Sequence, residues 1–396
     1  MRLIGGSAAR DTPSAFAHST ALMGDHTMRI LFGALAAITL ALPAAAHHGF
    51  GRFDPTREIE VEGTLTGLDF VNPHSYVHFD TIGADGQTLA MRCEMRAATV
   101  LRRSGWSPDL FVEGAHIVVT GRPHRDDPGS CYAETLEIGD APTLERYQQL
   151  SDVATVPANR PYRLANGRPN LAGDWAQEQY LIARAPGGRG GGLVPKSLVQ
   201  AVESGELDPA DVPNAGWGAR PVTLTDAGTA ASEVLRNRPP EENPRLSCQI
   251  TSILFDWAFD GPINRIVQGP DAITIDYGRG LTRTIHMDMA AHPAGIAPSR
   301  GGHSIGRWEG DTLVVDTVGF EPGGLAGNVP HSAGLHVVER FTLDPETFAL
   351  KREYVAEDSA YFTDQYIGED TVLPADAPFA VDQCEELAYE YTVGEE

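Results

Sequence analysis

Short apolar segments separated by closely spaced turn residues are the feature that most constrains the fold of this chain. In its second half, segments with the composition and partial alternation of β-strands are separated by Gly, Asp and Pro residues. These segments are residues 263–268, 272–277, 281–287, 303–308, 312–318, 336–343 and 348–356. The pattern predicts an antiparallel meander that closes into a barrel. The 42 glycines and 28 prolines of the chain also favour a turn-rich β protein over a helical bundle.

The first half of the chain predicts a second, smaller β unit. Strand-like segments are residues 59–69, 75–81, 88–94, 115–121 and 133–138, and residues 97–103 have helical composition. Three strands, a helix and two strands within about 90 residues are typical of a small OB-type barrel. Helical insertions in the larger unit are predicted at residues 197–204 and 227–237, the second with Thr225 as its N-cap.

Four regions follow from these patterns. We expect a leader and signal peptide over residues 1–46, and an OB-like barrel over residues 47–143. A linker that contains three prolines spans residues 144–169, and an antiparallel β-barrel spans residues 170–396.

An export signal is predicted before residue 47. Met28-Arg29 opens an apolar run, and Pro43 and three alanines follow it, which gives a basic start, a short apolar core and an A-x-A cleavage site. The run of about 13 residues is too short to cross a bilayer. We therefore expect a periplasmic or secreted protein whose mature chain has no transmembrane segment. Residues 1–27 lack an export pattern, and we attribute them to a start codon assigned too far upstream.

The cysteine count agrees with an oxidising compartment. Cys93, Cys131, Cys248 and Cys384 all lie after the predicted signal, and an even number in an exported chain favours disulfides. Of the three possible pairings, we predict Cys93–Cys131 and Cys248–Cys384, because each then closes within one predicted barrel.

The net charge limits the partners of this protein. The formal charge is −24 at pH 7, and such an acidic surface repels the phosphates of nucleic acids and anionic lipids. Nucleic acid is therefore excluded as a partner, and a small-molecule ligand is favoured.

The strongest candidate for chemistry is a β-hairpin. If Glu309-Gly310 forms its two-residue turn, Trp308 pairs with Asp311 and His303 pairs with Asp316. Directly opposed residues have Cβ atoms about 5 Å apart. The carboxylate would orient the imidazole and raise its pKa, as a general base requires, and Arg307 on the same face would stabilise negative charge. The alternative is a structural His–Asp pair inside the barrel or at its mouth.

Further polar residues surround this hairpin. Residues 289–302 and 319–334 are irregular, and loops at one rim of a barrel are where binding residues gather. The candidate ligand-binding residues are His286, Asp288, His292, His331, His336 and Arg340. One hypothesis is that a small, partly apolar ligand binds inside the barrel beside His303, Arg307 and Asp316. The other is an enzyme that transfers protons as an isomerase, lyase or hydratase. The alternative for each histidine is ordinary polar surface.

The new amino terminus is a candidate copper site. Cleavage after Ala46 leaves His47-His48, whose free α-amino group and first imidazole can chelate one copper ion. A histidine from elsewhere would complete the ligand set, and the candidates are His48, His74, His78 and His124. The alternative is an exposed, unstructured start.

Parts of the sequence resemble known families. Pro73-His74 followed by residues 101–106 resembles a bacterial secreted domain of unknown function, whose members tend to start with His-His after the signal peptide. Residues 302–317 and 335–341 resemble the signature of an uncharacterised exported β-barrel family, whose cysteine pattern Cys248 and Cys384 fit. The chain departs from that family in Cys93, Cys131 and residues 299–302.

Residues 173–175 resemble the G-x-W opening of lipocalin-type barrels. The expected fold class is therefore mainly β, a small OB-like barrel followed by an antiparallel lipocalin-like β-barrel with helical insertions. The resemblances imply fold and location, and they imply no activity.

Overall fold

The computed structural model describes ten stretches of the chain. They are residues 52–150, 160–178, 180–183, 192–195, 201, 204–206, 222–239, 242–244, 247–258 and 263–380. The predicted signal peptide, His47, His48, Cys384 and most of the predicted helix at residues 197–204 lie outside the described residues. No helix in the described stretches is long and apolar enough to cross a membrane.

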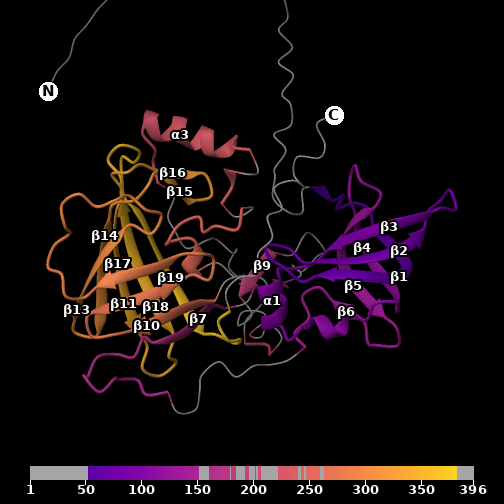
Figure 1. The fold of residues 1–396 in the computed structure, drawn as a ribbon, viewed down its shortest axis with the longest axis horizontal. Coiled ribbons are helices and arrows are strands. Elements are labelled where there is room, and N and C mark those ends of the chain that lie inside the picture. The colour runs from indigo at the N-terminus through magenta and orange to yellow at the C-terminus, as the bar shows by residue number, and fades with distance from the viewer. Residues whose placement is uncertain are drawn as a thin grey trace, which may run out of the picture. The chain divides into compact units, whose positions relative to one another are not determined.

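The first unit is a small closed β-barrel (Figure 1). Its elements are β1 (Ile59–Asp69), β2 (Tyr76–Ile82), β3 (Thr88–Glu94), α1 (Ala98–Arg103), η2 (Pro108–Leu110), β4 (His116–Pro123), β5 (Ser130–Ile138) and β6 (Leu144–Glu145). The sheet order is β3-β2-β1-β4-β5-β6, and a parallel pairing of β3 with β5 closes it. This is the predicted OB-type order, with the helix between the third and fourth strands.

A disulfide fastens the closing strands of this barrel. Cys93 on β3 is directly opposite Cys131 on β5, and their sulfur atoms are bonded. Both cysteines are fully buried among core residues such as Val77 and Phe79. The predicted pairing is confirmed. Cys248 is also disulfide-bonded, and its predicted partner Cys384 lies outside the described residues.

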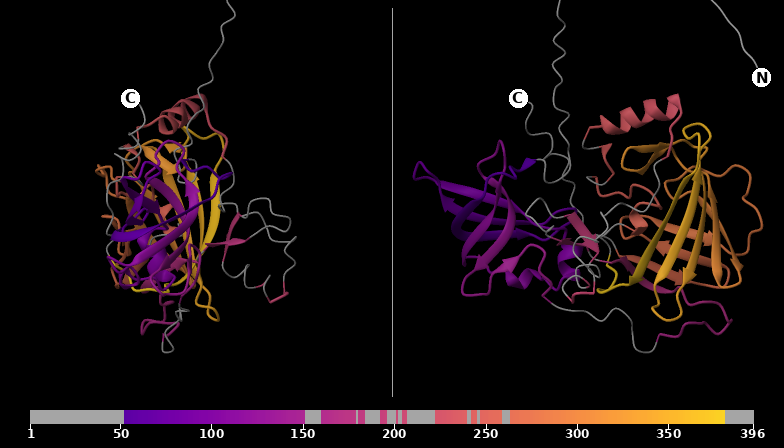
Figure 2. Two further views of the ribbon diagram at one scale, coloured as in Figure 1. Left: turned by 90° about the vertical axis from the view of Figure 1, so that its right-hand side faces the viewer. Right: turned by 180° about the vertical axis from the view of Figure 1, so that it is seen from behind.

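The second unit is a larger closed barrel, whose strands surround one core (Figures 1 and 2). In order around the barrel they are β10 (Asn264–Gln268), β11 (Ala272–Asp276), β12 (Thr282–His286), β13 (His303–Glu309), β14 (Thr312–Val318), β17 (His336–Leu343), β18 (Leu350–Glu357), β19 (Tyr366–Pro374) and β7 (Gly173–Gln177). All neighbours pair antiparallel except β12 and β13, which are parallel. The prediction of a wholly antiparallel barrel is wrong there, because residues 287–302 carry the chain back before β13 begins.

The remaining helices and strands lie in sequence between the strands of the second barrel. They are β8 (Tyr180–Ala183), β9 (Gly192–Pro195), α3 (Asp226–Arg236), η5 (Asp256–Ala258), β15 (Gly323–Ala326) and β16 (Val329–His331). α3 packs on β16, as Figures 1 and 2 show. Thr225 caps α3, because its hydroxyl oxygen accepts a hydrogen bond of 3.0 Å from the Gly228 amide. The predicted helix and its N-cap are confirmed.

The two faces of the β13–β14 hairpin are opposite to the expectation. Ser304 and Thr317 face the interior and are fully buried, whereas His303, Arg307 and Asp316 lie on the outer face. Apolar residues occur on both faces of these strands, so alternation did not decide which face is inside. The interior contains charged residues instead, which a hydrophobic pattern assigns to solvent.

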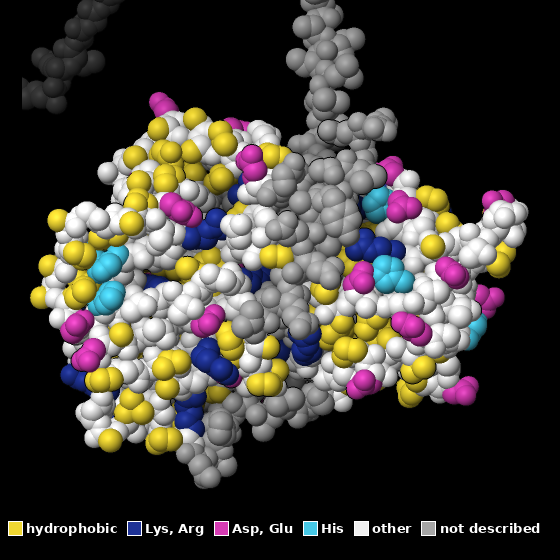
Figure 3. All heavy atoms as spheres, viewed as in Figure 1, with side chains coloured by type: hydrophobic (Ala, Val, Ile, Leu, Met, Phe, Trp, Pro, Cys, Tyr) yellow, Lys and Arg dark blue, Asp and Glu magenta, His cyan; other side chains and the backbone are white. Residues whose placement is uncertain are grey.

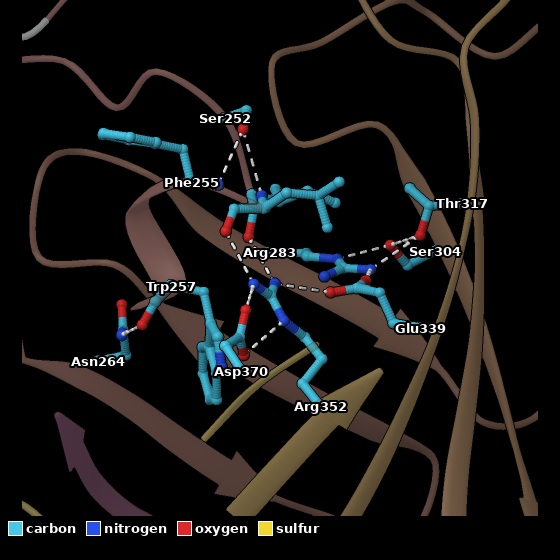
Figure 4. A network of polar contacts seen from close by, with 12 residues as sticks. Ser252, Phe255, Trp257, Asn264, Arg283, Ser304, Thr317, Glu339, Arg352 and Asp370 are labelled. Atoms are coloured by element: carbon cyan, nitrogen blue, oxygen red, sulfur yellow. Dashed lines mark hydrogen bonds and ion pairs between the residues drawn. The ribbon is translucent and has the colours of Figure 1, made fainter. Parts of the chain in front are cut away.

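A buried ionic network occupies the barrel interior (Figure 4). The Glu339 carboxylate accepts hydrogen bonds from Arg283 on one oxygen and from Arg352, at 3.1 Å, on the other. Arg352 also donates to the Leu254 carbonyl at 2.7 Å. Burial by itself lowers the pKa of Arg352, but the carboxylates of Asp370 and Glu339 outweigh it and hold that pKa above its ordinary range. The interior near these residues is therefore filled by protein groups.

Candidate functional site

The turn of the β13–β14 hairpin lies one residue later than predicted, and this moves the pairing of the two strands by two residues. Glu309 pairs with Thr312, so Gly310 and Asp311 form the turn. Gly310 has φ of +63°, and a type II′ turn needs such a residue at its first central position. As a result Ile305, and not His303, is directly opposite Asp316. The predicted direct pairing of His303 with Asp316 is wrong.

A third residue connects these two side chains on the outer face. His292 lies in the segment between β12 and β13, and its Nδ1 is 2.9 Å from His303 Nδ1. Its other nitrogen, Nε2, is 3.0 Å from Asp316 Oδ1. Asp316, His292 and His303 therefore form a continuous chain of hydrogen-bonding groups.

Two more histidines adjoin this chain. His336 on β17 places Nε2 3.1 Å from Asp316 Oδ1, and the His286 ring stacks on the His303 ring at 5.0 Å between centroids. We call His286, His292, His303, His336 and Asp316 the outer histidine cluster. Figure 3 shows histidine side chains exposed on the second barrel, in the area where Figure 1 places β13 and β14. All five residues were among the catalytic or ligand-binding candidates that the sequence placed at or around this hairpin.

Glu357 is a neighbour of the cluster that the sequence analysis did not include. Its Oε2 lies 3.8 Å from His336 Nδ1, and it is directly opposite His336 on β18. The predicted strand ended one residue earlier, at 356. Extending that strand and pairing it with residues 336–343 would have identified Glu357.

The pKa of His303 shifts in the direction opposite to the expectation. Partial burial, followed by the nearby imidazoles of His286 and His292, holds the pKa of His303 below its ordinary value. Asp316 does not touch His303, so it does not raise that pKa as predicted. His303 therefore binds a proton more weakly than an imidazole in water does.

The other predicted residues lie outside the cluster. Arg307 and Arg340 both pair with the exposed Glu309 carboxylate, at 2.8 Å and 2.9 Å. Asp288 is exposed. His331 is buried, packs edge-on against the Phe320 ring, and has Nδ1 3.2 Å from the Ser332 carbonyl oxygen.

We expect the second barrel to lose stability in mild acid. Burial lowers the pKa of His331, and His303 is shifted the same way, so both bind protons more weakly folded than unfolded. Below about pH 6.5 the unfolded chain gains protons that the folded chain does not, and the free energy of unfolding falls. Urea unfolding at pH 7.5 and pH 5.5 measures this. The His303→Gln variant should show a smaller drop, and an identical drop would contradict this assignment.

The first barrel contains the described part of the predicted copper site. His74 Nδ1 lies 3.2 Å from Glu94 Oε2, whereas His47 and His48 are outside the described residues. Within the described stretches, no group of three or more His, Cys, Asp or Glu residues is placed so that it could hold a metal ion.

Comparison with known proteins gives one match. Residues 35–131 match the model of a family described as a family of unknown function (DUF6152). This part of the chain is similar to that family. The match includes the predicted new amino terminus and most of the first barrel, in agreement with the resemblance to an uncharacterised domain. No curated protein and no solved structure matches. The resemblance of residues 302–341 to an exported barrel family stays a prediction.

Proposed function

We propose that this protein is an exported enzyme that transfers protons on a small, partly apolar substrate, with His303 as the base. The observation that carries the proposal is the position of His292, whose two ring nitrogens contact His303 and Asp316. Isomerisation, elimination and hydration are the reaction types that such a base supports.

The hydrogen-bond chain determines which nitrogen of His303 is basic. A carboxylate only accepts hydrogen bonds, so His292 donates from Nε2 to Asp316 and keeps a lone pair on Nδ1. That lone pair accepts the Nδ1 proton of His303, which leaves the lone pair of His303 on Nε2. His303 Nε2 would take the substrate proton, and His292 and Asp316 would stabilise the imidazolium that forms.

The surroundings of the cluster favour a partly apolar substrate. Ile305 and Val338 are the direct neighbours of Asp316 on β13 and β17, and both are half-buried on the outer face. We place the ligand against this outer face and not inside the barrel, because Glu339 and its two arginines occupy the interior. The hypothesis of a partly apolar ligand is kept, with its location changed.

Hydrogen exchange into small carbon acids tests the proposal without knowledge of the true substrate. The full chain is incubated in D₂O with a panel of hydroxy acids, ketones and unsaturated acids, and deuterium incorporation is measured by mass spectrometry. His303→Ala should slow incorporation by about 100-fold or more, because general bases contribute at least that much. Arg307→Gln is the matched control on the same strand, and its rate should be unchanged. Equal rates for His303→Ala and the unaltered protein, or no incorporation into any compound, would contradict the proposal.

Copper binding by the processed amino terminus is a second candidate function, favoured by the path of the chain after residue 51. The Arg125 amide donates to the Arg52 carbonyl at 2.9 Å, and Phe53 forms a β-bridge with His124. Burial, followed by the charge of Arg52, lowers the pKa of His124. Burial by itself raises the pKa of Glu94, but the neighbouring His74, followed by Arg146 and Arg52, outweighs it and holds that pKa below its ordinary value. The described part of the chain therefore begins close to Glu94, whose carboxylate lies 3.2 Å from His74 Nδ1, and His47 and His48 lie outside the described residues.

A further inference from the structure

We propose that the mouth of the first barrel binds a small, uncharged and mainly apolar molecule that carries one hydrogen-bond acceptor. A groove of about 410 Å³ opens there, between the ends of β1, β2, β3 and β4 and the residues that join β4 to β5. Its volume lies within the range of sites that bind small molecules, and the mouth of a β-barrel is a common place for them. None of its lining residues belongs to the outer histidine cluster, so this site is independent of the proposed catalytic one.

The wall of the groove is apolar and incompletely covered. Ile59 and Val61 on β1 and Leu89 on β3 line it, and all three are half-buried against the core of the barrel. Met91 lies on the same face of β3 as Leu89 and is 4% exposed. Apolar surface of the three half-buried side chains therefore stays accessible from the groove.

Ile82 adds a large apolar side chain at the rim of the groove. It is the last residue of β2, and its side chain is 70% exposed. Covering such a side chain with an apolar molecule is favourable, in proportion to the area removed from water. A ligand in the groove would therefore gain binding energy from Ile82 as well as from the wall.

His124 supplies a hydrogen-bond donor to the groove that it lines. Its Nδ1 accepts hydrogen bonds from the backbone amides of Asp126 and Asp127, at 3.1 Å and 3.0 Å. A nitrogen that accepts carries no proton, so in this geometry the ring is neutral and its proton is on Nε2. Burial, followed by the charge of Arg52, lowers the pKa of His124 and favours the same neutral form. Nε2 therefore donates, and it selects an acceptor such as a carbonyl oxygen.

The charges at the rim favour an uncharged ligand over an ion. The lining residues include two arginines, Arg57 and Arg125, and two aspartates, Asp126 and Asp127, whose charges balance. The chain as a whole has a formal charge of −24, and its field repels anions. A cation would find no acceptor at His124, because Nε2 carries a proton. An uncharged molecule with one acceptor satisfies all of these conditions.

Fluorescence titration of the full chain with prodan tests the inference. Prodan is an uncharged naphthalene that carries one carbonyl and one dimethylamino group, and its emission moves to shorter wavelength in apolar surroundings. We expect saturable binding, about 5-fold tighter than that of the analogue in which a methylene group replaces the carbonyl. The anion anilinonaphthalene sulfonate should bind more weakly than prodan.

Two substitutions test whether the probe lies in the groove. Ile82→Glu places a charge on the apolar rim and should weaken prodan binding by about 10-fold or more. Val112→Glu is the matched control, because Val112 is 61% exposed on the same barrel and does not line the groove. Both side chains are exposed, so circular dichroism should show the same fold for both variants. Equal prodan affinities of the two variants would contradict the proposed location.

A third substitution tests the donor. In His124→Asn the amide oxygen lies close to the place of Nδ1 and can accept from the two backbone amides, but no group takes the place of Nε2. This variant should bind prodan about 5-fold more weakly and bind the methylene analogue as the unaltered protein does. An equal change for both compounds, or none for prodan, would overturn the selection of an acceptor by His124. The whole inference fails if prodan does not saturate the unaltered protein or if the sulfonate binds more tightly.

Discussion

Replacing Glu339 by Gln should lower the free energy of unfolding by about 3–5 kcal/mol, the range for breaking a buried ion pair from one side. The Glu339 side chain is fully buried, and so are those of Arg283 and Arg352, which it pairs with. Glutamine keeps the size and one acceptor, but it leaves two buried guanidinium groups without the shared negative charge. Urea unfolding monitored by circular dichroism measures the loss.

The matched control for this prediction is Glu309→Gln. Glu309 also pairs with two arginines, Arg307 and Arg340, but on the exposed outer face of the same barrel. Solvent and salt screen these two ion pairs, so their loss should change the free energy of unfolding little. Equal effects of the two substitutions would show that burial does not determine the contribution of these networks.

Local sequence signals predicted most of the strands correctly. Alternating residues and turn residues identified β13 and β14, and Thr225 identified the start of α3, because each of these signals acts within a few residues. The order of elements in the first half was sufficient for the OB-type barrel and for the Cys93–Cys131 pairing.

The sequence analysis was wrong about features that depend on contacts between distant parts of the chain. The parallel pairing of β12 with β13 depends on the path of residues 287–302, which has no strand periodicity. The inner face of the second barrel could not be recognised, because Glu339 and Arg352 are buried through contacts with each other and with Arg283 and Asp370, which are distant in sequence. A hydrophobic pattern carries no information about such compensation.

The composition of the outer histidine cluster could be predicted, but its connectivity could not. His303 and Asp316 share a face in the predicted and in the observed register. The two registers differ by two residues, and side chains two residues apart on a strand lie on the same face. The two side chains are connected only through His292, which lies in an irregular segment and whose position is fixed by tertiary structure. The expected roles therefore changed: His292 connects the pair, and Arg307 lies elsewhere with Glu309.

Removing the first disulfide, by Cys93→Ala and Cys131→Ala together, should lower the free energy of unfolding by about 4 kcal/mol. The two cysteines are 38 residues apart, and the bridge limits the freedom of the unfolded chain across that loop. The double variant is preferable to either single one, because a lone thiol can attack the disulfide of Cys248 and exchange with it. Urea unfolding without reductant measures the difference.

The position of this disulfide determines how a smaller decrease in the free energy of unfolding would be interpreted. β3 and β5 form the parallel contact that closes the first barrel, and Cys93 and Cys131 are paired within it. A parallel contact between strands far apart in sequence is costly to form, because its loop must close first. A loss below about 1 kcal/mol would therefore contradict the loop-closure argument. It would indicate that the unfolded chain already holds these two strands near each other without the sulfur bond.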